Sequence, residues 1–589
     1  MALFFRLEEP SILVLMLNYK RLRIMINYRY SLLILVSTVL LISGCQKMED
    51  RPLERITEEY LWDTKDSLGT NASYFLNTIY GDLPTGFNRI DGNLLDAATD
   101  DAVPSGDNTV ISRFTDGGYS ASTNGDNSWA DNYASIRKCN LFFQNFPKVT
   151  LKTTLVQEGK YWMAENRFLR AIFYYELIKR YGGVPLLGDK VLTINDDLKL
   201  PRNTYQECVN YIVSECDAVT NEVRPDPVAN GDYGRITKMA VLTLKAKTLL
   251  FAASPLNNTL NEVAKWRKAK NALADVIRQA PAGSFALEPV FANVFLTRKN
   301  TEIILAFQRA VTFDVETNNA PIGYLSGSTT SRGRTSPTQD LVDAFTTSKG
   351  LPIASDLKSG ANPIGYDPNN PYANRDPRLS KTVFYNGLSW LSRGVETFTG
   401  GRDRSGGAVV QTKTGYYMSK FMGNFATGTA YSNQTHNFPI FRYADVLLMF
   451  VEAKNEVDGP GSTTDSVYNY VRAIRARAGI NQGITPNTYG VQSGLTVVQM
   501  RDLIRNERRV EMAFEEQRFW DLRRWKIAET VYNKPLHGIR ITKTGSALSY
   551  QVEELGIPFQ FIAPRMYRYA IPYSEISKNI NLTQNEGYQ

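Results

Sequence analysis

YWMAENRFLRAIFYYELIKRY, residues 161–181, is the clearest helical stretch of this chain and decides the expected fold. Its apolar residues recur at steps of three and four, which places them along one face of a helix. This stripe consists of Tyr161, Ala164, Phe168, Ala171, Tyr175 and Ile178. The segment GGVP (182–185) follows directly, and glycine with a proline beyond it is typical of a helix C-terminus. The spacing therefore predicts a helix over 158–181.

Periodic segments of similar length lie on both sides of this helix. They predict helices over 71–83, 129–146, 204–223, 238–253 and 261–279, and again over 441–456, 466–478 and 496–528. Successive helices with short breaks resemble stacked hairpins of the tetratricopeptide type. Between the two groups, apolar runs become short and only 338–345 is convincingly helical. We therefore expect a mainly α fold, in which a tetratricopeptide-like helical scaffold carries an irregular, loop-rich subdomain containing a few short strands.

The expected organisation has five parts. A signal peptide (1–44) and a lipidated tether (45–69) precede an N-terminal helical repeat region (70–282), an irregular loop-rich subdomain (283–439) and a C-terminal helical region (440–589). Residues 84–127, inside the first helical region, are rich in Gly, Asn, Asp and Ser and have few periodic apolar positions. Loops this long inside a compact domain are uncommon and are often functional. We therefore predict that 84–127 is a ligand-binding loop.

The N-terminal stretch LLILVSTVLLISGC (32–45) indicates where the protein works. Its apolar run has the length of a signal-peptide core and is too short to span a bilayer. A basic region precedes it, formed by Lys20, Arg21, Arg23 and Arg29. ISGC (42–45) resembles a bacterial lipobox, in which Cys45 is lipidated and becomes the mature first residue; an ordinary secretory signal with a chance cysteine is the alternative. Met16 and Met25 are candidate translation starts. We therefore expect a lipid-anchored protein outside the cytoplasm.

Composition argues against several classes of function. A net charge of +8 over 589 residues is too small an excess to suggest a nucleic-acid binder. The cysteines after Cys45 lack metal-type spacing and are expected to be small buried hydrophobic residues; they are Cys139, Cys208 and Cys216. Two histidines, far apart and outside any HExxH pattern, supply a zinc site or a His-dependent nucleophile poorly. We therefore expect no metal, no cofactor and no nucleic-acid partner; a calcium ion in the acidic loop 96–107, which lacks EF-hand spacing, stays open.

Eight segments carry a resemblance to a known family. They are NRFLRAIFYYELIKRYGGVPLL (166–187), GRITKMAVLTLKAKTLLFAASPLNN (234–258), SPTQDLVDAF (336–345), NRDPRL (374–379), FRYADVLLMFVEAKNE (441–456), VRAIRARAGI (471–480), RNERRVEMAFEEQRFWDLRRW (505–525) and AIPYSEI (570–576). In this order, behind a lipobox, they resemble the SusD/RagB family of nutrient-uptake outer-membrane lipoproteins of Bacteroidetes-type bacteria. The resemblance covers the chain from about residue 50 to its end.

The resemblance implies a function as well as a fold. Such proteins cap the extracellular mouth of a SusC-like TonB-dependent transporter in the outer membrane and capture an oligosaccharide, or sometimes a peptide, for import. They are not enzymes. Lys47, Glu49 and Asp50 follow Cys45 somewhat as in the acidic surface-export signal of lipoproteins in this bacterial group, which favours an outward-facing protein.

The most recognisable motifs of the chain are expected to be structural. In 505–525 the charged residues are predicted to alternate along a helix, with Trp520 and Trp525 packed against neighbouring helices. Glu507 falls on the core-leaning side of that helix and therefore needs an arginine partner. Asp376 and Arg378 are predicted to tie a turn by an ion pair.

A sugar-binding site needs flat aromatic rings beside polar side chains, and loops can expose such rings without destabilising a core. In the family, the site lies on loops of the N-terminal loop-rich stretch and of the irregular subdomain. The predicted ligand contacts are Trp390, Phe87, Arg89, Asp100, Asp101, Phe114, Tyr119, Tyr324 and Tyr385. Trp390, in YNGLSWLSRG (385–394), is the preferred platform; the alternative is that it pins the subdomain to the helices.

Two other functions stay open on the sequence. The same architecture could bind peptides or other nutrients. A glycoside hydrolase would need two carboxyl groups about 5–10 Å apart across a pocket. Asp100 and Asp101 are adjacent and diverge in an extended segment, and Glu515 and Glu516 fall on a charged helix. We therefore expect no enzymatic activity.

Overall fold

The computed structural model describes residues 58–126, 128–281, 283–326, 329–353, 365–404, 411–425, 431–483 and 488–588. Residues 62–589 group into one unit, called the body below, while α2 (Glu58–Leu61) belongs to the unit before it. The predicted signal peptide, Cys45 and the first part of the tether lie outside the described residues. Within the described part of the chain, no helix is both long and apolar enough to cross a bilayer.

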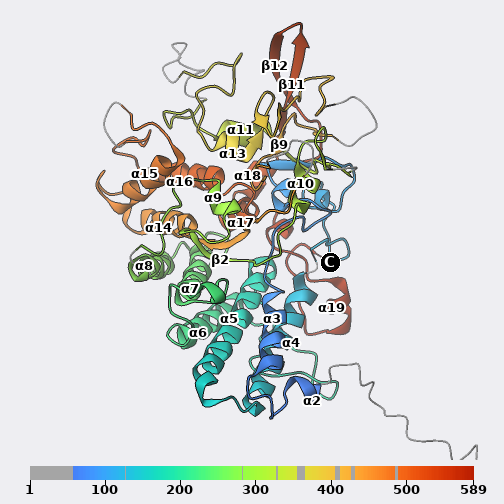
Figure 1. The fold of residues 1–589 in the computed structure, drawn as a ribbon, viewed down its shortest axis with the longest axis vertical. Helices are drawn as coiled ribbons and strands as arrows, with labels where there is room; N and C mark the ends of the chain where they lie inside the picture. The colour runs from blue at the N-terminus through green and yellow to red at the C-terminus, as the bar shows by residue number, and fades with distance from the viewer. Residues whose placement is uncertain are drawn as a thin grey trace, which may run out of the picture. The chain divides into compact units, whose positions relative to one another are not determined.

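Antiparallel helices form one half of the body (Figure 1). They are α3 (Thr70–Tyr80), α4 (Ser128–Asn145), α5 (Val156–Tyr181), α6 (Tyr205–Val219), α7 (Lys238–Ala253) and α8 (Val263–Gln279). Each helix packs on the next along the chain from α4 to α8. The sequence pattern predicted all six, and Thr204 starts α6 with a reciprocal capping box to Glu207.

Helix α5 is buried around most of its circumference, which is broader than the single predicted stripe. It contacts α3, α4, α6 and α7, so polar residues are enclosed as well as apolar ones. Each enclosed charge has an opposite partner: Glu165 Oε1 lies 2.8 Å from Arg224 Nε, and Arg170 Nη2 lies 2.8 Å from Glu215 Oε2. Tyr161, assigned to the stripe, is only half-buried.

The irregular subdomain follows, with short helices α9 (Asn293–Leu296), α10 (Asp314–Asn319), α11 (Gln339–Ala344) and α13 (Leu379–Thr382). Among the described residues, the strands of the body pair into six two-stranded antiparallel sheets. The pairs are β1 (Ala102–Pro104) with β5 (Thr335–Pro337), β2 (Ile303–Ala306) with β10 (Pro439–Arg442), β3 (Leu325–Ser326) with β4 (Thr329–Thr330), β6 (Val383–Phe384) with β9 (Tyr417–Met418), β7 (Ser389–Trp390) with β8 (Arg393–Gly394), and β11 (His537–Thr544) with β12 (Ala547–Glu554). The predicted fold class, mainly helical with a few short strands, is confirmed.

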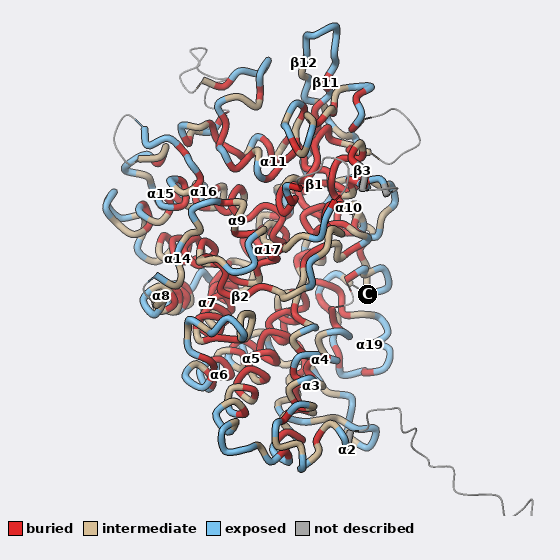
Figure 2. Tube along the Cα trace, viewed as in Figure 1, coloured by how far each residue is buried: buried red, intermediate tan, exposed pale blue. Residues whose placement is uncertain are grey.

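The C-terminal part returns to helices. It contains α14 (Tyr443–Asp458), α15 (Ser466–Ala478), α16 (Val497–Glu511), α17 (Gln517–Arg524), α18 (Ala528–Tyr532) and α19 (Tyr573–Lys578). It also contains the β11–β12 hairpin, which the sequence analysis missed. Figure 2 shows that this hairpin projects from the body with its far half exposed, whereas the centre of the body is buried.

The predicted helix over 496–528 is interrupted between α16 and α17. Phe514 and Glu516 adopt positive φ angles of 64° and 59°, which no helix accommodates. The Asp96 carboxyl group stabilises this break, because its two oxygens accept the backbone N–H groups of Phe514 and Glu516 at 2.8 and 3.3 Å. Burial of the Phe514 side chain, which is fully enclosed, holds the turn from the other side.

The charged residues of 505–525 converge on the interior, which corrects the prediction that they alternate along one helix. Arg442, fully buried, lies 2.8 Å from Glu511 and 2.7 Å from Glu515. The buried ion cluster also includes Glu302, Asp376, Arg378, Lys420, Arg475, Arg477 and Glu507. Its structural role was predicted correctly: Glu507 pairs with arginines, the Asp376–Arg378 ion pair is present, and Trp520 and Trp525 are buried.

Candidate functional site

The predicted ligand loop, 84–127, is joined to the irregular subdomain by a short antiparallel ladder. Strand β1 lies in this loop and pairs with β5, so that Ala102 faces Pro337. The Ser105 N–H extends the ladder by donating to the Arg334 carbonyl oxygen at 2.8 Å. The structure therefore brings together the two segments that were expected to form the ligand site.

Asp100 and Asp101 anchor this loop to the C-terminal helices. Asp100 Oδ2 lies 2.7 Å from Arg518 Nη2, and Asp101 Oδ1 lies 2.6 Å from Arg509 Nε. Burial alone raises the pKa of Asp100, but the guanidinium groups of Arg509 and Arg518 more than offset it and lower the pKa to about 2. The prediction that these carboxylates face a ligand is wrong, because both are buried in ion pairs.

Arg89 is a second anchor of the loop. Its guanidinium lies 2.8 Å from both Asp126 and Glu516, and 17% of its side chain is exposed. Burial raises the pKa of Asp126, but the cations of Arg180 and Arg89 prevail and lower it to about 2. Arg89 therefore ties the two ends of the loop to the break between α16 and α17.

The aromatic rings of the loop fill the core. Phe87, Phe114 and Tyr119 are all buried, with Phe114 stacked on Tyr119 at 4.9 Å between ring centroids and Phe87 set edge-on to Phe438 at 5.2 Å. The prediction of exposed platforms at these three positions is therefore wrong. Their packing explains why a loop this long keeps a fixed course.

Trp390 and Tyr324 also belong to the interior of the subdomain. Their ring centroids lie 4.7 Å apart, and the Trp390 indole N–H donates to the Gly423 carbonyl oxygen at 2.9 Å. The Tyr324 hydroxyl donates to the Arg393 carbonyl oxygen at 3.1 Å. Only 8% of Trp390 is exposed, so the prediction that it is an exposed platform is wrong. Its ring neighbours Tyr324, Phe384 and Tyr431 all belong to the subdomain, so Trp390 packs the subdomain internally and does not pin it to the helices as the alternative proposed.

Tyr385 differs from the other predicted residues because it is half-buried. Its ring stacks on Tyr372 with centroids 4.2 Å apart and planes 17° from parallel, and Tyr550 meets Tyr372 edge-on at 5.8 Å. All three pack against the core of the subdomain while remaining partly exposed. We call Tyr372, Tyr385 and Tyr550 the tyrosine platform.

Three separate elements position the platform. Tyr372 lies in the turn before α13, Tyr385 directly follows β6, and Tyr550 lies on β12. Figure 1 places α13 and the β11–β12 hairpin in the half of the body opposite α3–α6. Phe398 adjoins the hairpin, because Thr399 N–H donates to the Ile541 carbonyl oxygen at 2.8 Å, and the Lys543 ammonium lies 4.8 Å from the Phe398 ring centroid.

The platform is chemically suited to a polar ligand with apolar faces. Burial raises the pKa of Tyr372, Tyr385 and Tyr550, so their hydroxyls remain neutral donors and acceptors at physiological pH. Among the described residues, the hydroxyls of Tyr385 and Tyr550 have no hydrogen-bond partner, whereas Tyr372 bonds Tyr416 at 3.3 Å. Sugar rings present C–H faces and hydroxyls, which stacked aromatic rings with unoccupied hydroxyls accommodate.

The described residues contain no cluster of three or more His, Cys, Asp or Glu side chains arranged to hold a metal ion. Cys139, Cys208 and Cys216 are buried, and burial raises the pKa of each thiol. They are small packed side chains, as the sequence predicted.

Two family models match the chain. One, described as "SusD family", matches residues 288–588, and the other, described as "Starch-binding associating with outer membrane", matches residues 92–250. The chain belongs to the SusD family. The resemblance carried by the eight sequence segments is thereby confirmed.

SusD-like proteins are also the relatives found by direct comparison. SusD-like protein P2 of Formosa agariphila is 24% identical over 570 residues, which cover 95% of this chain and 100% of that protein. The crystal structure of a SusD-like protein from Bacteroides fragilis is 26% identical, covers 90% of this chain and 99% of its own, and superposes with a TM-score of 0.73. A laminarin-binding SusD-like protein has the same fold, with 19% identity, a TM-score of 0.61, and coverage of 88% and 99%.

Sequence reasoning missed two of the three platform residues in this SusD-family chain. Tyr550 could have been found, because HGIRITKT and ALSYQVEE flank the two-residue turn Gly545-Ser546, which is a hairpin signal. Tyr372 had no comparable signal: it lies in an irregular turn, and only the tertiary fold stacks it on Tyr385.

Proposed function

We propose that this SusD-family protein binds an oligosaccharide at the tyrosine platform on the cell surface and delivers it to a SusC-like TonB-dependent transporter. The observation that supports this proposal is the platform itself: Tyr372 and Tyr385 are stacked and partly exposed, and the hydroxyls of Tyr385 and Tyr550 have no hydrogen-bond partner among the described residues. Support comes from the matching model described as starch-binding, and from fold neighbours named as a carbohydrate-binding and a laminarin-binding SusD-like protein.

The proposal includes a lipid anchor on Cys45 and an outward-facing body. The lipobox-like ISGC segment supports it, and so does the second family description, which includes association with the outer membrane. Several acyl chains on one cysteine would hold a large body firmly at a bilayer, since each buried methylene contributes about 0.8 kcal/mol.

We further propose that the protein does not cleave its ligand. Hydrolysis would need two accessible carboxyl groups facing each other across a pocket. Asp100 and Asp101 are held by arginines, and Glu515 is buried between Lys420 and Arg442. New reducing ends after incubation of the purified protein with starch or laminarin would contradict this.

The first test is binding of starch and laminarin oligosaccharides by isothermal titration calorimetry. Tyr385→Ala removes the stack and the hydroxyl, and we expect it to lower affinity more than tenfold, about 1.4 kcal/mol. Tyr385→Phe keeps the ring and is expected to lose less affinity than Tyr385→Ala. The melting temperature should stay within about 2 °C in both variants, because Tyr385 is only half-buried.

Tyr74→Ala is the matched control, because Tyr74 lies on α3 and is 64% exposed. It should bind like the wild type. Unchanged affinity of Tyr385→Ala would remove the platform from the ligand site. Binding of peptide digests, and of no glycan, would replace the proposed ligand class.

A further inference from the structure

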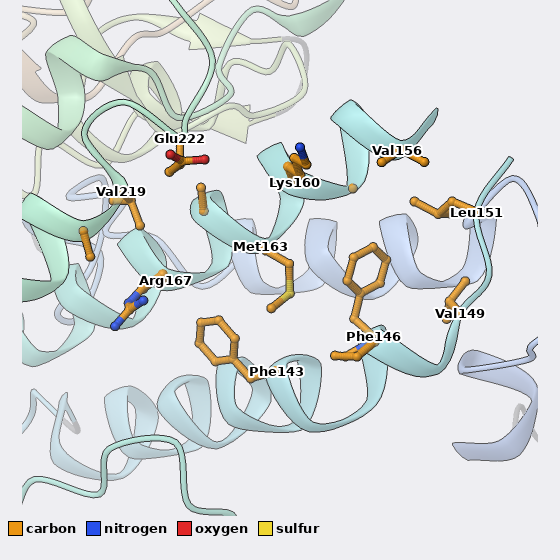
Figure 3. A pocket seen from close by; sticks show the side chains of 14 residues that line it. Phe143, Phe146, Val149, Leu151, Val156, Lys160, Met163, Arg167, Val219 and Glu222 are labelled. Atoms are coloured by element: carbon orange, nitrogen blue, oxygen red, sulfur yellow. The ribbon is translucent and has the colours of Figure 1, made fainter. Parts of the chain in front are cut away.

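An apolar groove of about 540 Å³ opens between α4, α5 and α6, in the helical half of the body. Figure 3 shows its lining, in which Phe143, Phe146, Val149, Leu151, Met163 and Val219 turn toward the same space. Its volume falls within the ~300–1,000 Å³ that is typical of ligand sites. The tyrosine platform contributes none of the residues that line it.

At the mouth of the groove, some charged side chains have an ion-pair partner in the described part of the chain and others do not. Lys160 lines the groove, is exposed, and has no ion-pair partner among the described residues. Arg167 lies 2.9 Å from Glu215, and Glu222 stands at the end of the groove near Val219 (Figure 3). Lysines 148 and 152 flank the lining residues 147, 149 and 151 and are both exposed. Glu158, in the same stretch, is paired with Arg224, so the three lysines leave the end formed by 147–160 with an excess of positive charge that favours an anionic group.

The first residues of the body lie against the wall of this groove. The Trp62 ring meets Phe142 edge-on at 5.7 Å, and Phe142 stacks on Phe146 at 4.8 Å. The Lys152 N–H donates to the Ser67 carbonyl oxygen at 2.9 Å. Cys45 precedes Trp62 by 17 residues, so a lipid on Cys45 would keep Trp62 within about 60 Å of a bilayer, at about 3.5 Å per extended residue.

We propose that this groove binds one acyl chain of an anionic membrane lipid, with the head group beside Lys160. Apolar walls take up the methylene chain, the lysine side of the mouth meets the negative charge, and the tether keeps the groove within reach of lipid. The bound lipid would give the body a second attachment to the membrane. The inference rests on the proposed lipid-anchored placement, but not on glycan binding.

The test uses dansyl-undecanoic acid, a fluorescent fatty acid, with the mature chain carrying Cys45→Ser. We expect saturable one-to-one binding with blue-shifted emission. Met163→Glu places a charge among the apolar walls and should weaken binding at least tenfold. Lys160→Gln should weaken binding of the acid about threefold or more, while leaving binding of the uncharged dansyl-undecanol unchanged.

The matched control is Val552→Glu, which adds the same charge at a position that is 53% exposed on β12 and outside the groove. It should bind like the parent chain, and circular dichroism melts should show that every variant is folded. Absent binding, or binding that Met163→Glu leaves unchanged, would overturn the proposal. A further comparison places the natively lipidated protein and Cys45→Ser in phosphatidylglycerol vesicles. If only Cys45→Ser binds the probe, the protein's own lipid anchor occupies the groove and the proposal is wrong. Starch and laminarin titrations on the same samples report separately on the proposed function.

Discussion

At the scale of single residues, Asp96 is a buried acid whose pKa is strongly raised. Its carboxyl is fully buried and accepts two backbone N–H groups from the break between α16 and α17. Burial, followed by the nearby charge of Asp101, raises the pKa of Asp96 from 3.8 to about 8. The fold therefore favours the protonated form of this acid.

This shift predicts a pH dependence with a definite sign. A folded-state pKa above the unfolded value means that the contribution of Asp96 to stability is complete below about pH 4 and is lost as pH rises through about 8. Asp96→Asn cannot ionise and keeps an oxygen acceptor. Relative to this variant, the wild type should lose free energy of unfolding by up to about 1.4 kcal/mol per pH unit across that window.

Urea denaturation at pH 5, 6.5 and 8 measures this difference. Asp197→Asn, at an exposed position, is the control and should follow the wild type at every pH. Parallel stability profiles for wild type and Asp96→Asn would show that Asp96 is ionised in the folded protein.

The residue scale is also where sequence reasoning about the site failed most often. The polar segment YNGLSWLSRG predicts no helix against which its tryptophan could pack, yet Trp390 is buried. The subdomain builds its core from short strands and loops, so periodicity carries no information about which rings face inward. Tyr385 was identified, but nothing in its local sequence distinguishes it from Tyr324.

At the scale of elements, the β11–β12 hairpin carries Tyr550 and stands out from the body (Figure 2). A two-stranded hairpin with little packing is marginally stable by itself. Gly545 occupies its turn with φ of 61°, a conformation that disfavours any side chain with a Cβ. The residue at position 545 therefore strongly influences whether the hairpin stays ordered.

Gly545→Val should fray the hairpin without unfolding the body. We expect amide hydrogen exchange at Thr542 and Ser549, which face each other in the ladder, to accelerate about tenfold, since forcing a β-branched residue to positive φ costs about 1–3 kcal/mol. Exchange in α5 and the global melting temperature should not change. Gly556→Val, at another positive-φ turn with no neighbour within 4 Å, is a control for general strain and should leave the hairpin amides unaffected.

Helices were the elements that the sequence predicted best. Periodic apolar residues predicted α4 to α8, helped by the capping box that starts α6 and by the GGVP segment after α5, because these signals are local. The break at 512–516 could not be predicted, because it depends on the carboxyl group of Asp96, more than 400 positions earlier in the chain. The glutamates and arginines of 505–525 are good helix formers, which concealed the interruption.

At the scale of the whole molecule, the buried ion cluster connects parts that lie far apart in the sequence. Glu302 belongs to the segment before β2, Arg442 ends β10, Glu511 ends α16, and Lys420 follows β9. Burial raises the pKa of Glu511, but the guanidinium groups of Arg477, Arg442 and Arg378 overcome this and hold it well below its usual range. The cluster therefore ties the subdomain to the C-terminal helices by charge.

Arg442→Met removes one cation and leaves buried carboxylates without their partner. We expect the free energy of unfolding to fall by about 3–5 kcal/mol, measured by urea denaturation at pH 7. Arg402→Met deletes a guanidinium that is 69% exposed and should change the free energy of unfolding by less than about 1 kcal/mol. Equal losses in the two variants would contradict a structural role for the cluster.

The ladder between β1 and β5, with the Asp100 and Asp101 anchors, has a consequence for engineering. Residues 84–127 cannot be exchanged between relatives as an isolated segment, because their conformation depends on pairing with 329–338 and on ion pairs with Arg509 and Arg518. A chimera that receives all three segments together should keep the conformation of 84–127. A chimera that receives 84–127 alone would bury Asp100 and Asp101 without their arginine partners.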